Sequence, residues 1–370
     1  VIRSYHLAMG WNWISANVAD QRLDDVVALL EPIKESVVAI KGQSGELTKD
    51  DQGNWQGDLS LLHPTRSYKI EMLQDDDLEL KGKPVLPADA TITLNKGWNW
   101  IGYISAEEVS VESVLQNLTA EENDVIKGLD CFAVYNGTTW AGSLTHLVPG
   151  EGYMYYSQSV KSFNYVEPET EDVIPDAFSP QWKYDARQYA DNMTVLARLY
   201  NGEQQVEADK YLIGAFSGNE CRGVAVEKEG HIFLTVHGEQ TGEQISLRAF
   251  DVVSGKEYMI KEELDFSSDV MKGSYASPES LHLGDPTGIH NIGTGMFIYP
   301  NPVRDRLYVR GEVDNIEDIR VVSTAGQTCI VTDRLSAEEG IDVSSLSKGI
   351  YFIVVKSVTD EIRQKFIKIE

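Results

Sequence analysis

The sequence predicts a multidomain, mainly β protein with two tandem α+β repeats, a central β-sandwich and a C-terminal immunoglobulin-like seven-stranded β-sandwich. Three observations support this fold class. The chain has 370 residues, which exceeds the roughly 100 to 200 residues of one domain. A Trp-rich motif occurs twice, about a quarter of the chain apart. Beyond the second copy, short apolar runs alternate with Gly- and Asn-containing turns, which is typical of β-domains.

The tandem repeats are predicted at residues 3–87 and 88–168. Gly10-Trp11-Asn12-Trp13-Ile14 returns as Gly97-Trp98-Asn99-Trp100-Ile101, and Ile40-Lys41-Gly42 returns as Ile126-Lys127-Gly128. Apolar residues at helical spacing follow each Trp motif and predict one half-buried helix per repeat, with Asp20 and Ser110 as N-caps. These residues are Leu23, Val26, Val27 and Leu30 in the first copy, and Val111, Val114, Leu115 and Leu118 in the second.

A change in pattern marks the central domain, predicted at residues 177–284. The acidic, proline-containing segment Glu167 to Pro175 reads as a linker before it, and Gly284 to Gly295 reads as a second linker after it. Strands with turn signals between them predict a β-sandwich. The expected strands are Met193 to Tyr200, Tyr211 to Phe216, Arg222 to Val226, His231 to His237 and Gln244 to Val253.

The C-terminal domain is predicted at residues 296–370. Pro300 and Pro302 favour an extended segment that does not pair as a central strand. The alternative is an ordinary immunoglobulin-like domain at the end of an enzyme. The segments that carry the pattern are Tyr299 to Pro302, Leu307 to Val309, Ile319 to Gln327, Ile341 to Leu346, Gly349 to Val355 and Lys365 to Ile369.

These segments, in this order, resemble the C-terminal sorting domain read by the type IX (Por) secretion system of Bacteroidetes. The resemblance implies export, recognition by the outer-membrane translocon and a sortase, and a secreted or outer-membrane cell-surface location. The motif residues are Pro300, Asn301, Pro302, Gly326, Gly349, Tyr351, Lys365 and Lys368.

The two repeats are similar to GWNWIS-type repeats of surface proteins from the same bacteria. The central region resembles a module that accompanies them, through Leu212 to Phe216 and Glu220 to Ala225. Neither resemblance implies an activity.

Charge and composition exclude several classes of function. The formal net charge is −26, and such a field repels phosphate backbones and anionic lipids, so nucleic-acid binding is disfavoured. No apolar run reaches about 18 residues, which predicts a chain that is not membrane-spanning. The three cysteines, Cys131, Cys221 and Cys329, fall in different predicted domains and predict no disulfide within a domain. The start at Val1 suggests processing or a longer parent chain.

The sequence contains no motif that specifies catalysis. H-E-x-x-H and a Rossmann fingerprint are both absent, so we expect no enzyme activity and no cofactor. His231 and His237 share one face of a predicted strand and are a minor metal-site alternative. Asp24-Asp25 and Asp75-Asp76-Asp77 could ligate Ca²⁺, but they lack EF-hand spacing and read as solvated surface.

The tryptophans are the candidate ligand-binding residues. Trp11 with Trp13, and Trp98 with Trp100, each share one face of a strand, as a buried core or an exposed platform for sugar rings. Trp55 and Trp140, next to Gly-containing turns, are the better candidates for exposure. The first functional hypothesis is a non-enzymatic surface adhesion protein that binds an extracellular protein or glycan. The alternative is the accessory C-terminal region of a longer secreted hydrolase or protease.

Overall fold

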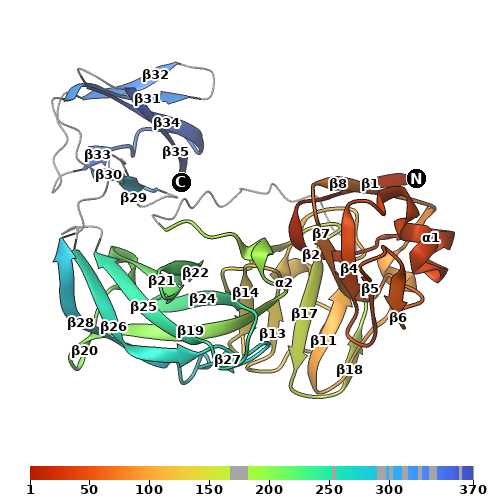
Figure 1. Ribbon diagram of the computed structural model, residues 1–370. Helices are drawn as coiled ribbons and strands as arrows, with labels where there is room; N and C mark the ends of the chain where they lie inside the picture. Colours follow the sequence, from red (N-terminus) through yellow and green to blue (C-terminus); the bar gives the residue numbers. More distant parts are fainter. Residues whose placement is uncertain are drawn as a thin grey trace.

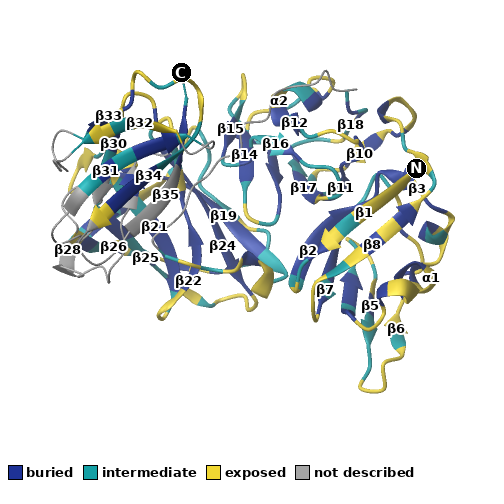
Figure 2. Cartoon of the chain, turned by 90° about the horizontal axis from the view of Figure 1, so that it is seen from above, coloured by how far each residue is buried: buried dark blue, intermediate teal, exposed yellow. Residues whose placement is uncertain are grey.

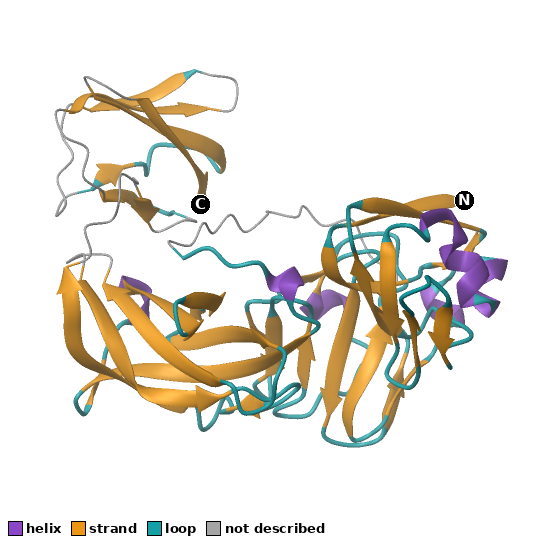
Figure 3. Cartoon of the chain, in the orientation of Figure 1, coloured by secondary structure: helices purple, strands orange, loops and turns teal. Residues whose placement is uncertain are grey.

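The computed structural model describes residues 1–166, 182–251, 256–289, 297–299, 303–310, 316–323, 327–332, 340–357 and 361–369. It is mainly β, and its helices are few and short (Figures 1 and 3). Four hydrophobic clusters lie in successive parts of the chain, within residues 7–80, 90–165, 193–283 and 298–366. We refer to these parts as repeat 1, repeat 2, the central domain and the C-terminal domain. The predicted linker Glu167 to Pro175 lies outside the described residues.

Repeat 1 is built around a five-stranded sheet of order β2-β7-β4-β5-β6, with all neighbours antiparallel. Two two-stranded ladders, β1-β8 and β3-β9, complete it. Its strands are β1 (Ile2–Leu7), β2 (Gly10–Ser15), β3 (Val18–Ala19), β4 (Val37–Lys41), β5 (Glu46–Lys49), β6 (Trp55–Gly57), β7 (Ser67–Met72), β8 (Asp76–Lys81) and β9 (Lys83–Pro84).

The helix predicted in repeat 1 is broken into three short pieces, η1 (Gln21–Asp24), α1 (Val26–Leu30) and η2 (Glu31–Ile33). Asp20 caps η1 by accepting a hydrogen bond from the Arg22 amide, and Asp25 caps α1 through the Ala28 amide. Pro32 has no N–H to donate and so cannot extend α1. Val27 is 41% exposed, so it does not belong to the buried stripe that its spacing predicts.

Repeat 2 has the same sheet order, β11-β17-β13-β14-β15, and a matching register between its first two strands. Its predicted helix is reduced to α2 (Val111–Val114), which Ser110 caps as expected. The strands are β10 (Ile92–Leu94), β11 (Gly97–Gly102), β12 (Val109–Ser110), β13 (Val125–Lys127), β14 (Phe132–Tyr135), β15 (Trp140–Gly142), β16 (His146–Leu147), β17 (Gly152–Ser157) and β18 (Lys161–Phe163).

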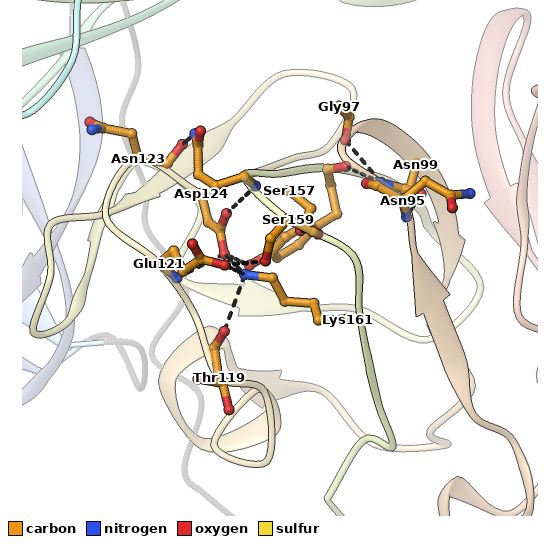
Figure 4. A network of polar contacts seen from close by, with 12 residues as sticks. Asn95, Gly97, Asn99, Thr119, Glu121, Asn123, Asp124, Ser157, Ser159 and Lys161 are labelled. Carbon is orange, nitrogen blue, oxygen red and sulfur yellow. Dashed lines mark hydrogen bonds and ion pairs between the residues drawn. The ribbon is translucent and has the colours of Figure 1, made fainter.

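The Gly-x-Asn part of the repeated motif closes the turn before each Trp strand. Gly10 and Gly97 have φ values of 89° and 95°, a region that favours glycine. The Asn99 amide donates to Asn95 O at 2.8 Å and to Gly97 O at 2.9 Å (Figure 4). Asn12 bonds Ala8 O and Gly10 O in the same way. The motif therefore specifies a turn as well as a pair of indoles.

A buried polar network around Asp124 joins the segment before β13 to β17 and β18 in repeat 2 (Figure 4). The fully buried Asp124 carboxylate accepts from Lys161 Nζ at 2.8 Å, Tyr155 Oη at 2.7 Å and the Gln158 amide at 2.8 Å. Burial and the Asp124 charge raise the pKa of Tyr155, so its phenol remains a donor. Each oxygen of this buried carboxylate has a donor, which a stable buried charge requires.

The two repeats contact each other through corresponding strands. Ile14 and Glu151 form an isolated antiparallel bridge, and the Ser15 amide donates to Gly150 O at 2.9 Å. Ser15 Oγ donates to Glu151 O at 2.6 Å. In repeat 2 the residue equivalent to Ser15 is Gly102, and a Cβ there would lie 2.1 Å from Pro64 O. Glycine is therefore required for this close approach.

The central domain is one bent sheet around a single core, with the strand order β22-β21-β25-β26-β28-β19-β24-β23. β28 pairs antiparallel with β26 and parallel with β19, which joins the two halves. The pattern missed β26 and β28, and β28 continues to Ile289, beyond the predicted domain end at Gly284. The main strands are β19 (Asp191–Asn201), β21 (Tyr211–Ser217), β22 (Glu220–Val224), β23 (Val226–Lys228), β24 (His231–Gly238), β25 (Gln244–Asp251), β26 (Lys256–Asp265) and β28 (Glu279–Ile289), and β20 (Gln204–Gln205) and β27 (Met271–Lys272) both pair with β19.

The C-terminal domain has a three-stranded sheet, β29-β30-β33, and a four-stranded sheet, β32-β31-β34-β35, within its described residues. Side chains from both sheets, among them Leu307, Val321 and Phe366, share one core. Two sheets around one core make a β-sandwich. The strands are β29 (Phe297–Tyr299), β30 (Arg306–Arg310), β31 (Ile316–Ser323), β32 (Thr328–Thr332), β33 (Ile341–Asp342), β34 (Gly349–Ser357) and β35 (Glu361–Lys368).

Candidate functional site

The repeated tryptophans and three lysines form one alternating array, which we call the Trp–Lys ladder (Trp11, Trp13, Trp98, Trp100, Lys41, Lys69 and Lys127). Lys69 Nζ lies 4.4 Å from the Trp13 ring centroid and 4.7 Å from that of Trp100. Lys127 Nζ lies 4.6 Å from the Trp98 centroid and 5.7 Å from that of Trp13. These are cation–π distances, so rings of each repeat hold ammonium groups of both.

The ladder also carries the contact with the central domain. Trp13 Nε1 donates to Ala190 O at 3.2 Å, and Trp98 Nε1 donates to Asp269 O at 2.7 Å. Both acceptors belong to the chain around β19 and β27. The two indole N–H groups therefore link one repeat each to the central domain.

Two ion pairs, each between a buried lysine and a partly exposed aspartate, cross the same boundary. Lys69 Nζ lies 2.7 Å from Asp191 Oδ1, and Lys127 Nζ lies 2.7 Å from Asp269 Oδ1. The side chains of Lys69 and Lys127 are 3% and 0% exposed. Burial lowers the pKa of Lys127 to about 8, although the charge of Asp269 acts in the opposite direction. An unpaired charge at this depth would be strongly destabilising, so each lysine depends on its acidic partner.

An apolar contact between repeat 2 and the central domain lies beside the ladder. Phe132 packs on Phe233 with ring centroids 5.5 Å apart, and Val134 and Leu196 belong to the same cluster. This contact covers the outer faces of β19 and β24, which are buried along almost their whole lengths (Figure 2). The central domain is thus covered on that face by repeat 2.

Trp11 and Trp98, two of the four tryptophans predicted as ligand platforms, lie within the ladder. Trp11 is 9% exposed, and Lys41 Nζ lies 5.2 Å from its ring centroid. Trp98 packs on Tyr156 with ring centroids 5.3 Å apart and bonds the central domain. Trp98 is therefore part of a contact between domains, whereas Trp11 is buried against Lys41 of its own repeat. The repeated Ile-Lys-Gly segment was the available sequence signal for Lys41 and Lys127, and Lys69 lies outside it.

Trp55 and Trp140 are half-buried at the free edges of the two repeat sheets. Lys49 Nζ lies 4.9 Å from the Trp55 centroid. Trp140 packs against Tyr135 and Tyr155, with centroids 5.4 Å and 5.9 Å away. Each ring closes one end of a repeat core and leaves part of its surface open.

The carboxylates of the acidic cluster Asp75-Asp76-Asp77 each contact another group of the protein. Asp75 accepts from the Met9 amide, Asp76 from Ser36 Oγ at 2.6 Å, and Asp77 contacts His6 at 3.0 Å. No group of three or more His, Cys, Asp or Glu residues in the described part of the chain is arranged to hold a metal ion. Likewise, no helix there has the length and apolar character to cross a bilayer.

The two histidines considered as metal ligands have other partners. His231 Nε2 lies 3.0 Å from Arg198 Nη2, and the ring stacks on Tyr275. Burial lowers the pKa of His231, which favours the neutral ring as the acceptor of the Arg198 proton. His237 faces two backbone carbonyls, Arg222 O and Leu129 O, each at 3.0 Å. Both residues are structural in this geometry.

A surface cavity of about 410 Å³ in repeat 1 was not expected from the sequence. Arg22 lines this cavity, and its Nη2 donates to Asp20 Oδ2 at 2.7 Å and to Glu79 O at 2.6 Å. The hydrogen bonds from Arg22 hold the pKa of Asp20 well below its usual range. The lining combines charged residues with the apolar side chains of Ile2, Pro32 and Ile33, and Asp20 and Arg22 form an ion pair within it.

The sorting-motif residues are only partly within the described chain. Tyr351 stacks on Phe366 with centroids 5.8 Å apart, and its hydroxyl donates to Ser347 O at 3.0 Å. Lys368 is 2% exposed, and its backbone forms a parallel bridge with Val303. Gly349 begins β34, and Lys365 lies in β35, where only its backbone is described. The remaining motif residues, Pro300, Asn301, Pro302 and Gly326, lie outside the described residues.

Comparison with known proteins identifies one segment of this chain. Residues 297–370 match the family model of the secretion system C-terminal sorting domain. No curated protein matched the chain. The matched segment coincides with the two-sheet C-terminal domain, and it indicates export of the protein by the type IX secretion system.

Proposed function

We propose that this chain is a non-enzymatic surface interaction protein, in which repeats 1 and 2 and the central domain form one ligand-presenting unit. The C-terminal sorting domain is the observation that carries the proposal, because an exported chain acts outside the cell. The unit would bind an extracellular protein or a glycan at the cell surface.

The open parts of Trp55 and Trp140 support a binding role for the repeats. Both follow exposed turns, Asp51 to Asn54 in repeat 1 and Gly137 to Thr139 in repeat 2. Half-exposed indoles next to a polar turn supply apolar area together with hydrogen-bonding groups, a combination enriched in binding surfaces. The two rings occupy equivalent positions, so a ligand with a repeated structure would contact both.

An array of glycans and extracellular-matrix proteins tests this proposal with the full chain and its Trp55→Ala and Trp140→Ala variants. We expect saturable binding that weakens about tenfold in at least one variant, the effect of losing a central aromatic contact worth roughly 1.4 kcal/mol. Leu61→Ala, which removes a 50% exposed apolar side chain from repeat 1, is the matched control. Absence of saturable binding by the folded wild-type chain would refute the interaction function.

A further inference from the structure

Three reactive groups meet at the boundary between repeat 2 and the central domain. Lys127 Nζ lies 2.8 Å from the side-chain oxygen Oδ1 of Asn192 and 2.7 Å from Asp269 Oδ1. Lys127 and Asn192 are completely buried. The three residues come from β13, from β19 and from the segment before β27. An amine and a carboxamide are therefore held together away from water, next to a carboxyl group whose side chain is 28% exposed.

Burial raises the fraction of Lys127 that is in the neutral, nucleophilic form. Burial disfavours the ammonium ion and lowers the pKa of Lys127 to about 8, and Asp269 is in position to accept its proton. The Trp98 and Trp13 rings, 4.6 Å and 5.7 Å from Nζ, fill space next to the amine. Exclusion of water from Lys127 and Asn192 protects the carboxamide from competing hydrolysis.

The carboxamide of Asn192 is held in one orientation. Its Nδ2 donates to Gly128 O at 3.2 Å and to Leu129 O at 2.7 Å, which directs Oδ1 towards Lys127. The Asp269 amide donates to Asn192 O at 3.0 Å, so the acid is tied to the same residue by its backbone. Fixed proximity of this kind replaces most of the entropy cost of bringing two groups together.

We propose that Lys127 and Asn192 become joined by an isopeptide bond, formed with Asp269 as the proton carrier, that links repeat 2 covalently to the central domain. The Nζ lone pair of the neutral amine attacks Cγ of Asn192, and Asp269 transfers a proton from Nζ to Nδ2. The Cγ–Nδ2 bond then breaks, ammonia leaves and the Nζ–Cγ amide remains. Atoms and electrons balance without an oxidant or co-reactant.

The second buried lysine of the ladder is an internal control. Lys69 Nζ lies 2.7 Å from a carboxylate, that of Asp191, where Lys127 has an amide. Burial acts to raise the pKa of Asp191, but the charge and hydrogen bond of Lys69 and the charge of Lys127 hold it below its usual value, which favours the ionised carboxylate. The carbon of an ionised carboxylate is a poor electrophile for attack by an amine. Lys69 therefore remains a free amine.

Intact-mass spectrometry of the purified full chain under denaturing conditions tests the proposal. We expect a mass lower than that of the sequence by one molecule of ammonia. Proteolysis should then yield a branched peptide that joins the segments around Lys127 and Asn192, while Lys69 stays accessible to amine-specific labelling in the denatured chain. The full sequence mass in a folded preparation, or an ammonia loss that maps to another position, would overturn the assignment.

Two variants are used so that the mass measurement remains informative if one of them fails to fold. Lys127→Arg keeps a cation in the ladder, and Asp269→Asn keeps a residue that tolerates the positive φ of 61° at this position. We expect both to show the full mass of their own sequences. Circular dichroism establishes that each variant is folded. A branched peptide in folded Asp269→Asn would contradict the role assigned to Asp269.

Discussion

At the scale of single residues, the ladder lysines show how buried charge can join domains. Removing an ammonium ion from water is costly, and Lys69 and Lys127 offset this cost with a carboxylate and with aromatic rings. The spacing of Trp11 and Trp13 correctly predicts that their rings share a face. The spacing does not predict what this face packs against, because the lysines and carboxylates that contact the tryptophans come from strands distant in sequence.

The indole of Trp13 gives the first prediction. Trp13→Phe removes the hydrogen bond to Ala190 O and part of the ring between Lys69 and Lys127. We expect the free energy of unfolding to fall by about 1–3 kcal/mol, from one lost hydrogen bond and a small cavity. Urea unfolding measures it. Trp55→Phe, at a sheet edge, is the control and should cost less than half as much; equal losses would argue against a special role for Trp13.

The Asp20–Arg22 pair gives a prediction on pH. The hydrogen bonds from Arg22 depress the pKa of Asp20 in the folded chain. The ionised carboxylate therefore stabilises the fold fully above the unfolded pKa of about 4, and this stabilisation is lost progressively as the pH falls towards the lower pKa of the folded chain. Asp20→Asn keeps the capping oxygen and removes the charge. We expect the variant to be about 1 kcal/mol less stable at pH 7, with the difference shrinking below pH of about 4. A difference independent of pH in urea unfolding would refute the charge effect.

At the scale of elements, the sequence specifies strands better than helices. Gly10, Asn12 and their counterparts Gly97 and Asn99 determine a turn and a strand by local geometry, and the structure has both in each repeat. The apolar stripes predicted longer helices than α1 and α2 because periodicity does not register Pro32 or the tertiary contacts that replace helical bonds. β26 was missed because its charged residues interrupt the apolar alternation.

The contact between the repeats gives a prediction at this scale. Gly102→Ser introduces the residue that repeat 1 carries at the equivalent position, yet its Cβ would lie 2.1 Å from Pro64 O. We expect a loss of about 1–3 kcal/mol, typical of overpacking, measured by urea unfolding. Ser15→Ala, which loses a hydroxyl bond to Glu151 O, should cost about 1 kcal/mol. A neutral Gly102→Ser variant would show that the repeats do not pack this closely.

At the scale of the whole molecule, composition and motif order predicted a mainly β chain with a C-terminal sorting domain, and the sheets and the family match agree with that coarse description. The docking of repeat 2 on the central domain was not predicted. A sequence difference between the repeats could have predicted this docking. Phe132 and Val134 of repeat 2 occupy the positions of Glu46 and Thr48 in repeat 1. At these two positions, apolar residues occur in the repeat whose sheet packs on the central domain.

The central claim is that the repeats and the central domain behave as one unit joined by the Trp–Lys ladder. Hydrogen-exchange mass spectrometry of the full chain across a urea series tests it most directly, with peptides from β7 and β24. The account predicts the same opening free energy and the same urea dependence for both, because neither domain opens without exposing the ladder. Separate opening free energies, with β7 exchanging while β24 stays protected, would contradict it.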